Sequence, residues 1–91
     1  MTDFSQEIRD GMAVVTGAGA GLGRELSRAL VAEGVRVAGI GRSTAPLADL
    51  ADELGEAFLP VTADVSDSQA VEQAFHKIET VAGTPTILIN N

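Results

Sequence analysis

Short apolar runs alternate along this chain with segments whose apolar residues recur every three or four positions. The continuous runs at residues 12–15, 35–40 and 86–89 predict strands that are buried on both faces of a sheet. Residues 57–61 predict a further strand, and Pro60 favours the sheet edge for it because proline has no N–H to donate. The pattern therefore predicts four strands separated by helical segments.

The helical segments have apolar faces and recognisable ends. In the first, Gly34 is the stop signal, and the apolar face carries Leu22, Leu26, Ala29 and Leu30. The second begins near Pro46 and ends at Gly55, with Leu47, Leu50 and Leu54 on its apolar face. Ser66 or Asp67 can cap the third, which ends at Gly83 and has an apolar face of Val71, Ala74, Phe75, Ile78 and Val81.

The order of these elements is β-α-β-α-β-α-β with short connections, which predicts an α/β fold with a parallel sheet covered by helices. Residues 1–10 predict a short helical or irregular lead-in, with Phe4 and Ile8 as its apolar anchors. No repeat, linker or low-complexity segment divides the 91 residues, so one small domain is expected.

Composition excludes several classes of protein. The chain has no Cys and a single His, His76, so it offers neither a disulfide framework nor a metal site of those residues. Its acidic start is unlike a signal peptide, and no apolar run reaches the ~20 residues of a membrane span. A net charge of −7 disfavours nucleic acid and anionic lipid as partners. We therefore expect an acidic, cytoplasmic domain that acts away from membranes.

A glycine-rich segment joins the first predicted strand to the first predicted helix. It reads Thr16-Gly17-Ala18-Gly19-Ala20-Gly21-Leu22-Gly23. The chain must turn sharply, bring its backbone close to a phosphate and enter a helix packed tightly on the sheet, and glycine suits each task. The N–H groups at the helix start then face an anion such as pyrophosphate. The segment predicts a nucleotide-binding turn.

The glycine spacing separates several kinds of nucleotide site. No Gly-Lys-Ser/Thr follows, which excludes a P-loop, and no frame gives Gly-x-Gly-x-x-Gly. Gly17, Gly19 and Gly21 do give Gly-x-Gly-x-Gly, as in S-adenosylmethionine sites of methyltransferases. Such sites usually carry an acidic residue before the glycines and another after the second strand, and this chain has neither.

The spacing Thr-Gly-x-x-x-Gly-x-Gly resembles that of the short-chain dehydrogenase/reductase family. Three further segments resemble the family in the right order: the lead-in at residues 9–17, Asp64-Val65 after the third strand and Asn90-Asn91 after the fourth. The resemblance implies a Rossmann-type doubly wound parallel sheet, here partial, with strand order 3-2-1-4. In that order, right-handed crossovers place the first two helices on one face and the third on the other.

The resemblance also implies site residues. The family's Asp, here Asp64, contacts the adenine amino group, and Asn90 ties the fourth strand to its neighbours through side-chain hydrogen bonds. The candidate cofactor-binding residues are Gly17, Ala20, Gly21, Leu22, Gly23, Arg42, Ser43, Asp64, Val65 and Asn90.

The end of the second strand bears on the choice of cofactor. In folds of this kind an acidic residue there accepts hydrogen bonds from the adenosine ribose and repels a 2′-phosphate. This chain has Gly41 at that position, followed by Arg42, whose guanidinium can pair bidentately with a 2′-phosphate. Ser43 or Thr44 can add a hydroxyl donor. The segment predicts NADP rather than NAD, although Ala20 stands where many NADP-preferring members carry a basic residue.

The family's activity is hydride transfer between the nicotinamide and a small alcohol or carbonyl substrate. Its catalytic residues are a Ser after a fifth strand and a Tyr followed four residues later by Lys. This chain has no Tyr, and its only Lys is Lys77. We therefore name no catalytic residue and expect residues 1–91 to be the N-terminal part of a single NAD(P)-binding domain, a fragment that is inactive by itself.

One alternative of a different class stays open: a non-catalytic nucleotide-binding or interaction module. The coding sequence after Asn91 discriminates, because a dehydrogenase continues Ala-Gly and reaches Ser and then Tyr-x-x-x-Lys. The substrate, the reaction direction and a homo-oligomeric state are left undetermined by this sequence.

Overall fold

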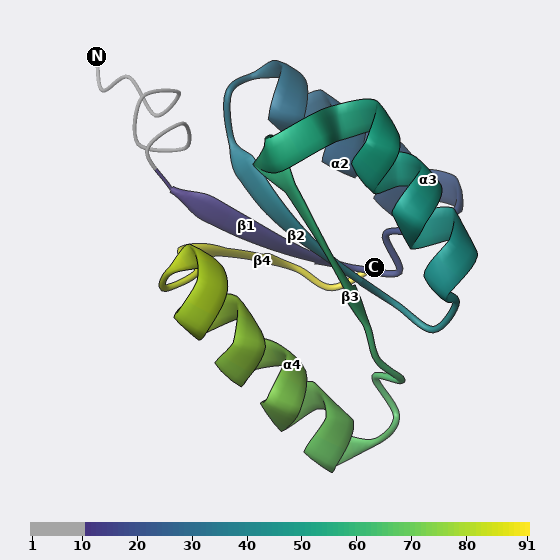
Figure 1. Ribbon diagram of the computed structural model, residues 1–91, viewed down its shortest axis with the longest axis vertical. Helices are drawn as coiled ribbons and strands as arrows, with labels where there is room; N and C mark the ends of the chain where they lie inside the picture. The colour runs from purple at the N-terminus through teal and green to yellow at the C-terminus, as the bar shows by residue number, and fades with distance from the viewer. Residues whose placement is uncertain (1–10) are drawn as a thin grey trace.

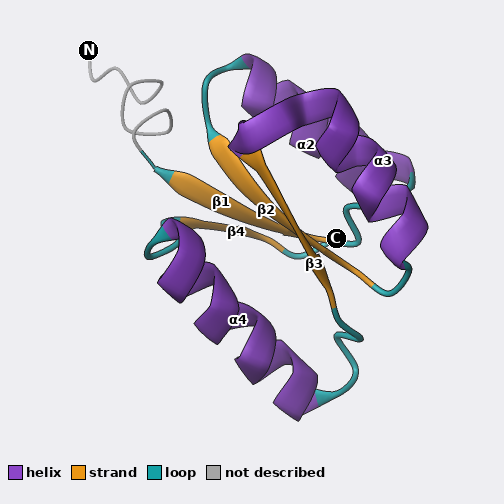
Figure 2. Cartoon of the chain, in the orientation of Figure 1, coloured by secondary structure: helices purple, strands orange, loops and turns teal. Residues whose placement is uncertain are grey.

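The computed structural model describes residues 11–91, so the predicted lead-in at residues 1–10 lies outside the described part. Within it, the chain forms one four-stranded sheet of order β3-β2-β1-β4 in which each adjacent pair is parallel. The strands, orange in Figure 2, are β1 (Met12–Thr16), β2 (Arg36–Gly41), β3 (Phe58–Thr62) and β4 (Ile87–Ile89). The predicted strand order is confirmed, and Pro60 lies on an edge strand as predicted, where its missing N–H leaves the ladder to β2 intact.

Helices cover both faces of the sheet. The helices are α2 (Gly21–Ala32), α3 (Thr44–Leu54) and α4 (Ser68–Ala82), and a 3₁₀ turn at Gly55–Ala57 follows α3. Figure 1 shows α2 and α3 on one side of the strands and α4 on the other, the arrangement that right-handed crossovers predict. The α/β, doubly wound architecture is therefore confirmed.

The two layers of the core meet on β1, which is buried on both faces. Ala13 and Val15 belong to the layer under α2 and α3, whereas Met12 and Val14 belong to the layer under α4. This double burial explains why the strand is a continuous apolar run instead of an alternation of apolar and polar residues. The site elements on either side of β1 are thus attached to the most enclosed strand of the sheet.

Helix α2 contacts the sheet through a face that matches the predicted one only in part: Leu30 packs against the core as predicted, but the fully buried positions are others. Gly23 and Ser27 are its buried residues, whereas Leu22 is 66% exposed and Ala29 is also exposed. Small residues let the helix axis approach the strands closely, and the buried hydroxyl of Ser27 is satisfied by donating to the carbonyl of Gly23 at 2.9 Å. Leucine spacing alone therefore predicted the contact of Leu30 but not the burial of Gly23 and Ser27.

Helix α4 is capped by Asp67, one of the two predicted caps, whose carboxylate accepts from the N–H groups of Gln69 and Ala70. Its predicted apolar face needs one correction. Val81 is 62% exposed, because Ile78 and Ala82 occupy the sheet side of the last turn.

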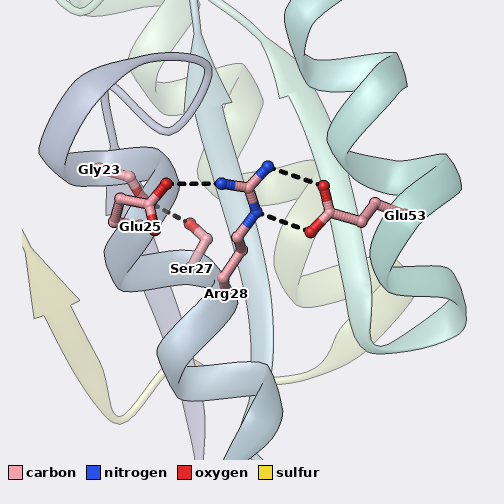
Figure 3. Close-up of polar contacts among 5 residues, drawn as sticks. All are labelled: Gly23, Glu25, Ser27, Arg28 and Glu53. Carbon is pink, nitrogen blue, oxygen red and sulfur yellow. Dashed lines mark hydrogen bonds and ion pairs between the residues drawn. The ribbon is translucent and has the colours of Figure 1, made fainter.

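A forked ion pair joins α2 to α3 on the surface (Figure 3). Arg28 Nε lies 2.6 Å from Glu53 Oε2, and Arg28 Nη2 lies 2.8 Å from Glu53 Oε1. Glu25, one turn before Arg28 on α2, accepts from Nη1 of the same guanidinium. The hydrogen bond and positive charge of Arg28 lower the pKa of Glu53 below its ordinary range.

Because of this ion pair, we expect Glu53 to make a small contribution to the pH dependence of folding stability. A carboxyl whose pKa is lower in the folded state stabilises the fold above its unfolded pKa, near pH 4.3, and this contribution is lost as the pH falls through the lower folded value. Glu53→Gln should therefore reduce the drop in melting temperature between about pH 5 and pH 3. The matched control is Glu56→Gln, an exposed residue outside the Arg28 contacts. Identical pH profiles for wild type and Glu53→Gln would contradict the assignment.

Candidate functional site

The carboxyl end of β1 is where the strand order of the sheet reverses. From β1 the chain leads through α2 to β2 on one side, whereas β4 pairs with β1 on the other side. In open parallel sheets such a switch point forms a crevice in which ligands bind. The glycine-rich turn lies at this position.

A pocket of about 250 Å³ opens beside the turn. It is lined by Thr16, Gly17, Gly19, Ala20, Ile40, Gly41, Arg42, Ser43, Pro46, Ala63, Val65 and Asn91. The structure thus brings five predicted site residues to one cavity: Gly17, Ala20, Arg42, Ser43 and Val65. The other five, Gly21, Leu22, Gly23, Asp64 and Asn90, are not among its lining residues.

The turn itself uses glycine where the backbone requires it. Gly17 and Gly21 have φ values of +65° and +56°, in the left-handed region that other residues rarely adopt. A Cβ on Gly21 would meet nothing within 4 Å among the described residues, so the space over the helix start is open. That opening lets a ligand approach the backbone.

The start of α2 is uncapped within the described residues. Ala20 is the N-cap, in an extended conformation and without a side-chain hydrogen bond to the helix. Alanine is a poor N-cap, and a Ser, Thr, Asp or Asn there typically adds ~1 kcal/mol. The first N–H groups of α2 therefore remain available, together with the positive end of the helix dipole, to an anion outside the chain.

Gly23 packs against the turn. A Cβ at this position would lie 2.2 Å from the carbonyl oxygen of Gly17 and 2.9 Å from Asn91 Nδ2. The sequence predicts a glycine where the helix packs tightly on the sheet, and Gly23 is tightly packed, but its partners are Gly17 and Asn91 instead of the strand surface. Gly23 thereby sets how closely α2 and the turn approach each other.

A hydroxyl hub joins the ends of β1 and β4. Thr16 Oγ1 donates to Asn90 Oδ1 at 3.1 Å and accepts from the N–H of Asn91 at 3.0 Å. Asn90 therefore makes the interstrand side-chain hydrogen bond that the resemblance implies for it. Sequence reasoning missed Thr16 and Asn91 as site residues, although the pair Asn90-Asn91 after a strand was the available signal.

Arg42 and Ser43, which follow β2, also line the pocket. Ser43 is the N-cap of α3, and its side chain makes no capping hydrogen bond, so its hydroxyl is not committed to the helix. A Cβ on Gly41 would lie 3.3 Å from a methyl carbon of Leu47, so a side chain at position 41 would require a small adjustment of Leu47. An exposed guanidinium and a hydroxyl thus stand together where an acidic residue is absent.

Asp64 follows β3 near Arg42. Its Oδ1 accepts from the N–H of Ser66 at 2.9 Å and from the Ser66 hydroxyl at 2.7 Å. These hydrogen bonds, with the positive charge of Arg42, lower the pKa of the Asp64 carboxyl below its ordinary range. The carboxylate is therefore ionised at neutral pH and fixed in a turn next to Val65, which lines the pocket.

A larger hollow, of about 390 Å³, lies between α3 and α4 beside β3. Its walls are mainly alanine, proline and aliphatic side chains, with Lys77 and Gln73 at the α4 side. It contains no turn with converging backbone N–H groups, so we take the smaller pocket as the candidate site. Across residues 11–91, no three His, Asp or Glu side chains are gathered so as to hold a metal ion. None of the helices in that part of the chain has both the length and the apolar character needed to cross a bilayer.

Comparisons with known proteins agree with this geometry. Residues 11–91 match the family model described as short chain dehydrogenase. A "probable NADP-dependent dehydrogenase" of Dichelobacter nodosus is 38% identical over 80 residues, which are 88% of this chain and 76% of that protein. The serine 3-dehydrogenase of Agrobacterium fabrum is 38% identical over 81 residues, 89% of this chain.

A solved structure shows the same likeness in three dimensions. The 3-ketoacyl-(acyl-carrier-protein) reductase of Brucella melitensis, complexed with NADH, superposes with a TM-score of 0.84 and 32% identity. The match covers 86% of this chain and 32% of that one. The chain likewise spans 32% of the Agrobacterium enzyme, so it corresponds to about a third of these two proteins.

Proposed function

The chain belongs to the short chain dehydrogenase family, and from that premise we propose that it is the NADP-binding N-terminal part of an oxidoreductase. The observation that carries this proposal is the pocket at the switch point, which is lined both by Ala20, the uncapped start of α2, and by Arg42. A dinucleotide presents charged phosphate at both places when it carries a 2′-phosphate. The uncapped start of α2 suits the pyrophosphate, and Arg42 suits the 2′-phosphate.

The proposed pyrophosphate site is built from backbone. The open space over Gly21 and the N–H groups of the first turn of α2, which no side chain caps, suit the binding of a diphosphate. Bound there, the phosphates replace the missing N-cap of α2, because phosphate oxygens accept from the N–H groups that Ala20 leaves unsatisfied.

The proposed choice of NADP depends on this chain's own residues. One relative is named NADP-dependent, whereas one structural neighbour was solved with NADH, so membership of the family alone does not fix the cofactor. Arg42 supplies the positive charge, Ser43 an uncommitted hydroxyl, and Gly41 replaces the acidic residue that would repel a 2′-phosphate. The adenine base would lie beside Val65 and Asp64, since the resemblance implies that Asp64 contacts the adenine amino group.

We assign no step of the reaction to residues of this chain. The bound nicotinamide supplies or accepts the hydride, and the proton donor expected for the family, a Tyr, is absent from these 91 residues. A longer protein that contains this chain would act on an alcohol or carbonyl substrate, and the chain by itself should show no turnover. The cytoplasmic location, the lack of nucleic-acid and membrane partners, and the homo-oligomer that the sequence leaves open stay predictions.

Titration of the 91-residue chain with NADPH and NADH tests the proposal. NADPH should bind about tenfold to hundredfold more tightly, because a charge-assisted contact to the 2′-phosphate contributes ~1.5–3 kcal/mol. S-adenosylmethionine should not compete. Equal affinity for the two dinucleotides would overturn the choice of NADP, and binding of neither would overturn the proposed function. Oxidation of NADPH with any carbonyl substrate, above a control without protein, would contradict the expected inactivity of the chain.

A further inference from the structure

The ring of Phe58 reaches from the edge strand toward the glycine-rich turn. The Cα of Phe58 on β3 pairs with Val37 on β2, yet the tip of its ring lies over Gly39, two residues nearer the carboxyl edge of the sheet. An ideal Cβ on Gly39 would lie 2.3 Å from Phe58 Cζ and 2.6 Å from its Cε1. The missing side chain of Gly39 is therefore the space that the ring fills.

Ala18, in the middle of the glycine-rich turn, meets the same point. Its Cβ lies 2.8 Å from the Cβ position of Gly39, and Ala18 is fully buried in the core cluster that contains Phe58. Its N–H donates to the carbonyl of Ile40 on β2 at 3.1 Å. The turn is thus attached to the sheet by one hydrogen bond and by one methyl group that packs beside the aromatic ring.

We propose that Phe58 is a positioning residue for the pyrophosphate, with Gly39 as its matching space. The ring sets how far Ala18 sinks toward the sheet, and Ala18 carries with it the backbone of Gly17 and Gly19 on either side. Because the core is close-packed, removal of the ring tip would leave a void beside Ala18, and a Cβ at Gly39 would displace the ring. Either change would shift Ala18 relative to the sheet. This inference depends on the proposed dinucleotide site, but the packing under the turn exists without a ligand.

Two substitutions perturb this packing in opposite senses. Phe58→Leu removes the ring tip, and Gly39→Ala adds a methyl group where the ring tip now lies. The matched control is Val35→Ala, which trims a buried residue of the same core cluster just before the amino end of β2. Each variant of the 91-residue chain is titrated with NADPH and with adenosine 2′-monophosphate, which has the 2′-phosphate but no pyrophosphate. Hydrogen exchange of the Ala18 amide is followed without ligand.

Phe58→Leu should weaken NADPH binding about tenfold, which corresponds to the loss of one charge-assisted hydrogen bond. Binding of adenosine 2′-monophosphate should be unchanged. The Ala18 amide should exchange faster than in Val35→Ala. If Phe58→Leu does not fold, Gly39→Ala decides by the same measurements. Equal weakening of both ligands, or unchanged NADPH binding with unchanged exchange at Ala18, would overturn the proposal. Failure of the wild-type chain to bind NADPH would instead contradict the proposed function, and the exchange measurement would still test the packing.

Discussion

Valine in place of Gly23 should destabilise the chain and remove most of its affinity for NADPH. The Cβ alone would lie 2.2 Å from the Gly17 carbonyl oxygen, a backbone atom that cannot rotate away. Relief requires α2 to move away from the turn, and overpacking of this kind typically costs ~1–3 kcal/mol. The movement also displaces the N–H groups of the first turn of α2, so binding should fall by at least about tenfold, the loss of one charge-assisted hydrogen bond.

Gly19→Ala is the matched control, because it lies in the same turn but has room. Its Cβ would lie 3.3 Å from Pro46 Cβ and 3.8 Å from the Leu47 side chain, so only a small adjustment is needed. Thermal melting of both variants with and without NADPH makes the comparison. A Gly23→Val chain that melts like wild type and keeps its full NADPH-induced shift would show that the turn and α2 do not meet as described.

Arg42→Ala should abolish the discrimination between NADPH and NADH. The guanidinium is exposed at the pocket edge and no acidic residue occupies position 41, so its proposed partner is the 2′-phosphate of the cofactor. NADPH affinity should fall about tenfold to hundredfold, while NADH affinity changes little. Binding titrations with both dinucleotides measure the two changes separately.

The control for Arg42 is on the same strand. Arg36 stands at the opposite end of β2, where its Nη1 donates to the Ala82 carbonyl at the end of α4. Arg36→Ala removes an equal charge and should leave the ratio of the two affinities intact. A similar loss of NADPH binding in both variants would mean that net charge, instead of contact with the 2′-phosphate, favours NADPH.

The strand order and the layers of helices could be predicted because short connections and right-handed crossovers leave few arrangements of alternating strands and helices. The turn after β1 was also predictable, since glycine alone adopts the left-handed backbone of Gly17 and Gly21 without strain. Both predictions depend on short stretches of sequence: the connections between successive elements in the first case, and the glycines themselves in the second.

What the sequence could not predict depends on distant partners. The buried face of α2 is set by how closely the helix approaches the strands, which favours Gly23 and Ser27 over the larger Leu22. Asn91 enters the pocket because β4 pairs with β1, and the space under Ala18 is filled by a ring from β3. The spacing of hydrophobic residues along one helix or strand carries no information about such tertiary contacts.

The hydroxyl hub at Thr16 has a consequence for how the site is assembled over time. Its hydrogen bonds to Asn90 and Asn91 join residues 74 and 75 positions apart. Closing so long a loop costs conformational entropy before its contacts contribute any stabilising free energy. Such pairings are therefore late events in folding. A chain emerging from the ribosome therefore has the glycine-rich turn long before it has the Asn91 side chain that packs against Gly23. Dinucleotide that binds only the assembled pocket would stabilise the pairing of β4 with β1 by mass action.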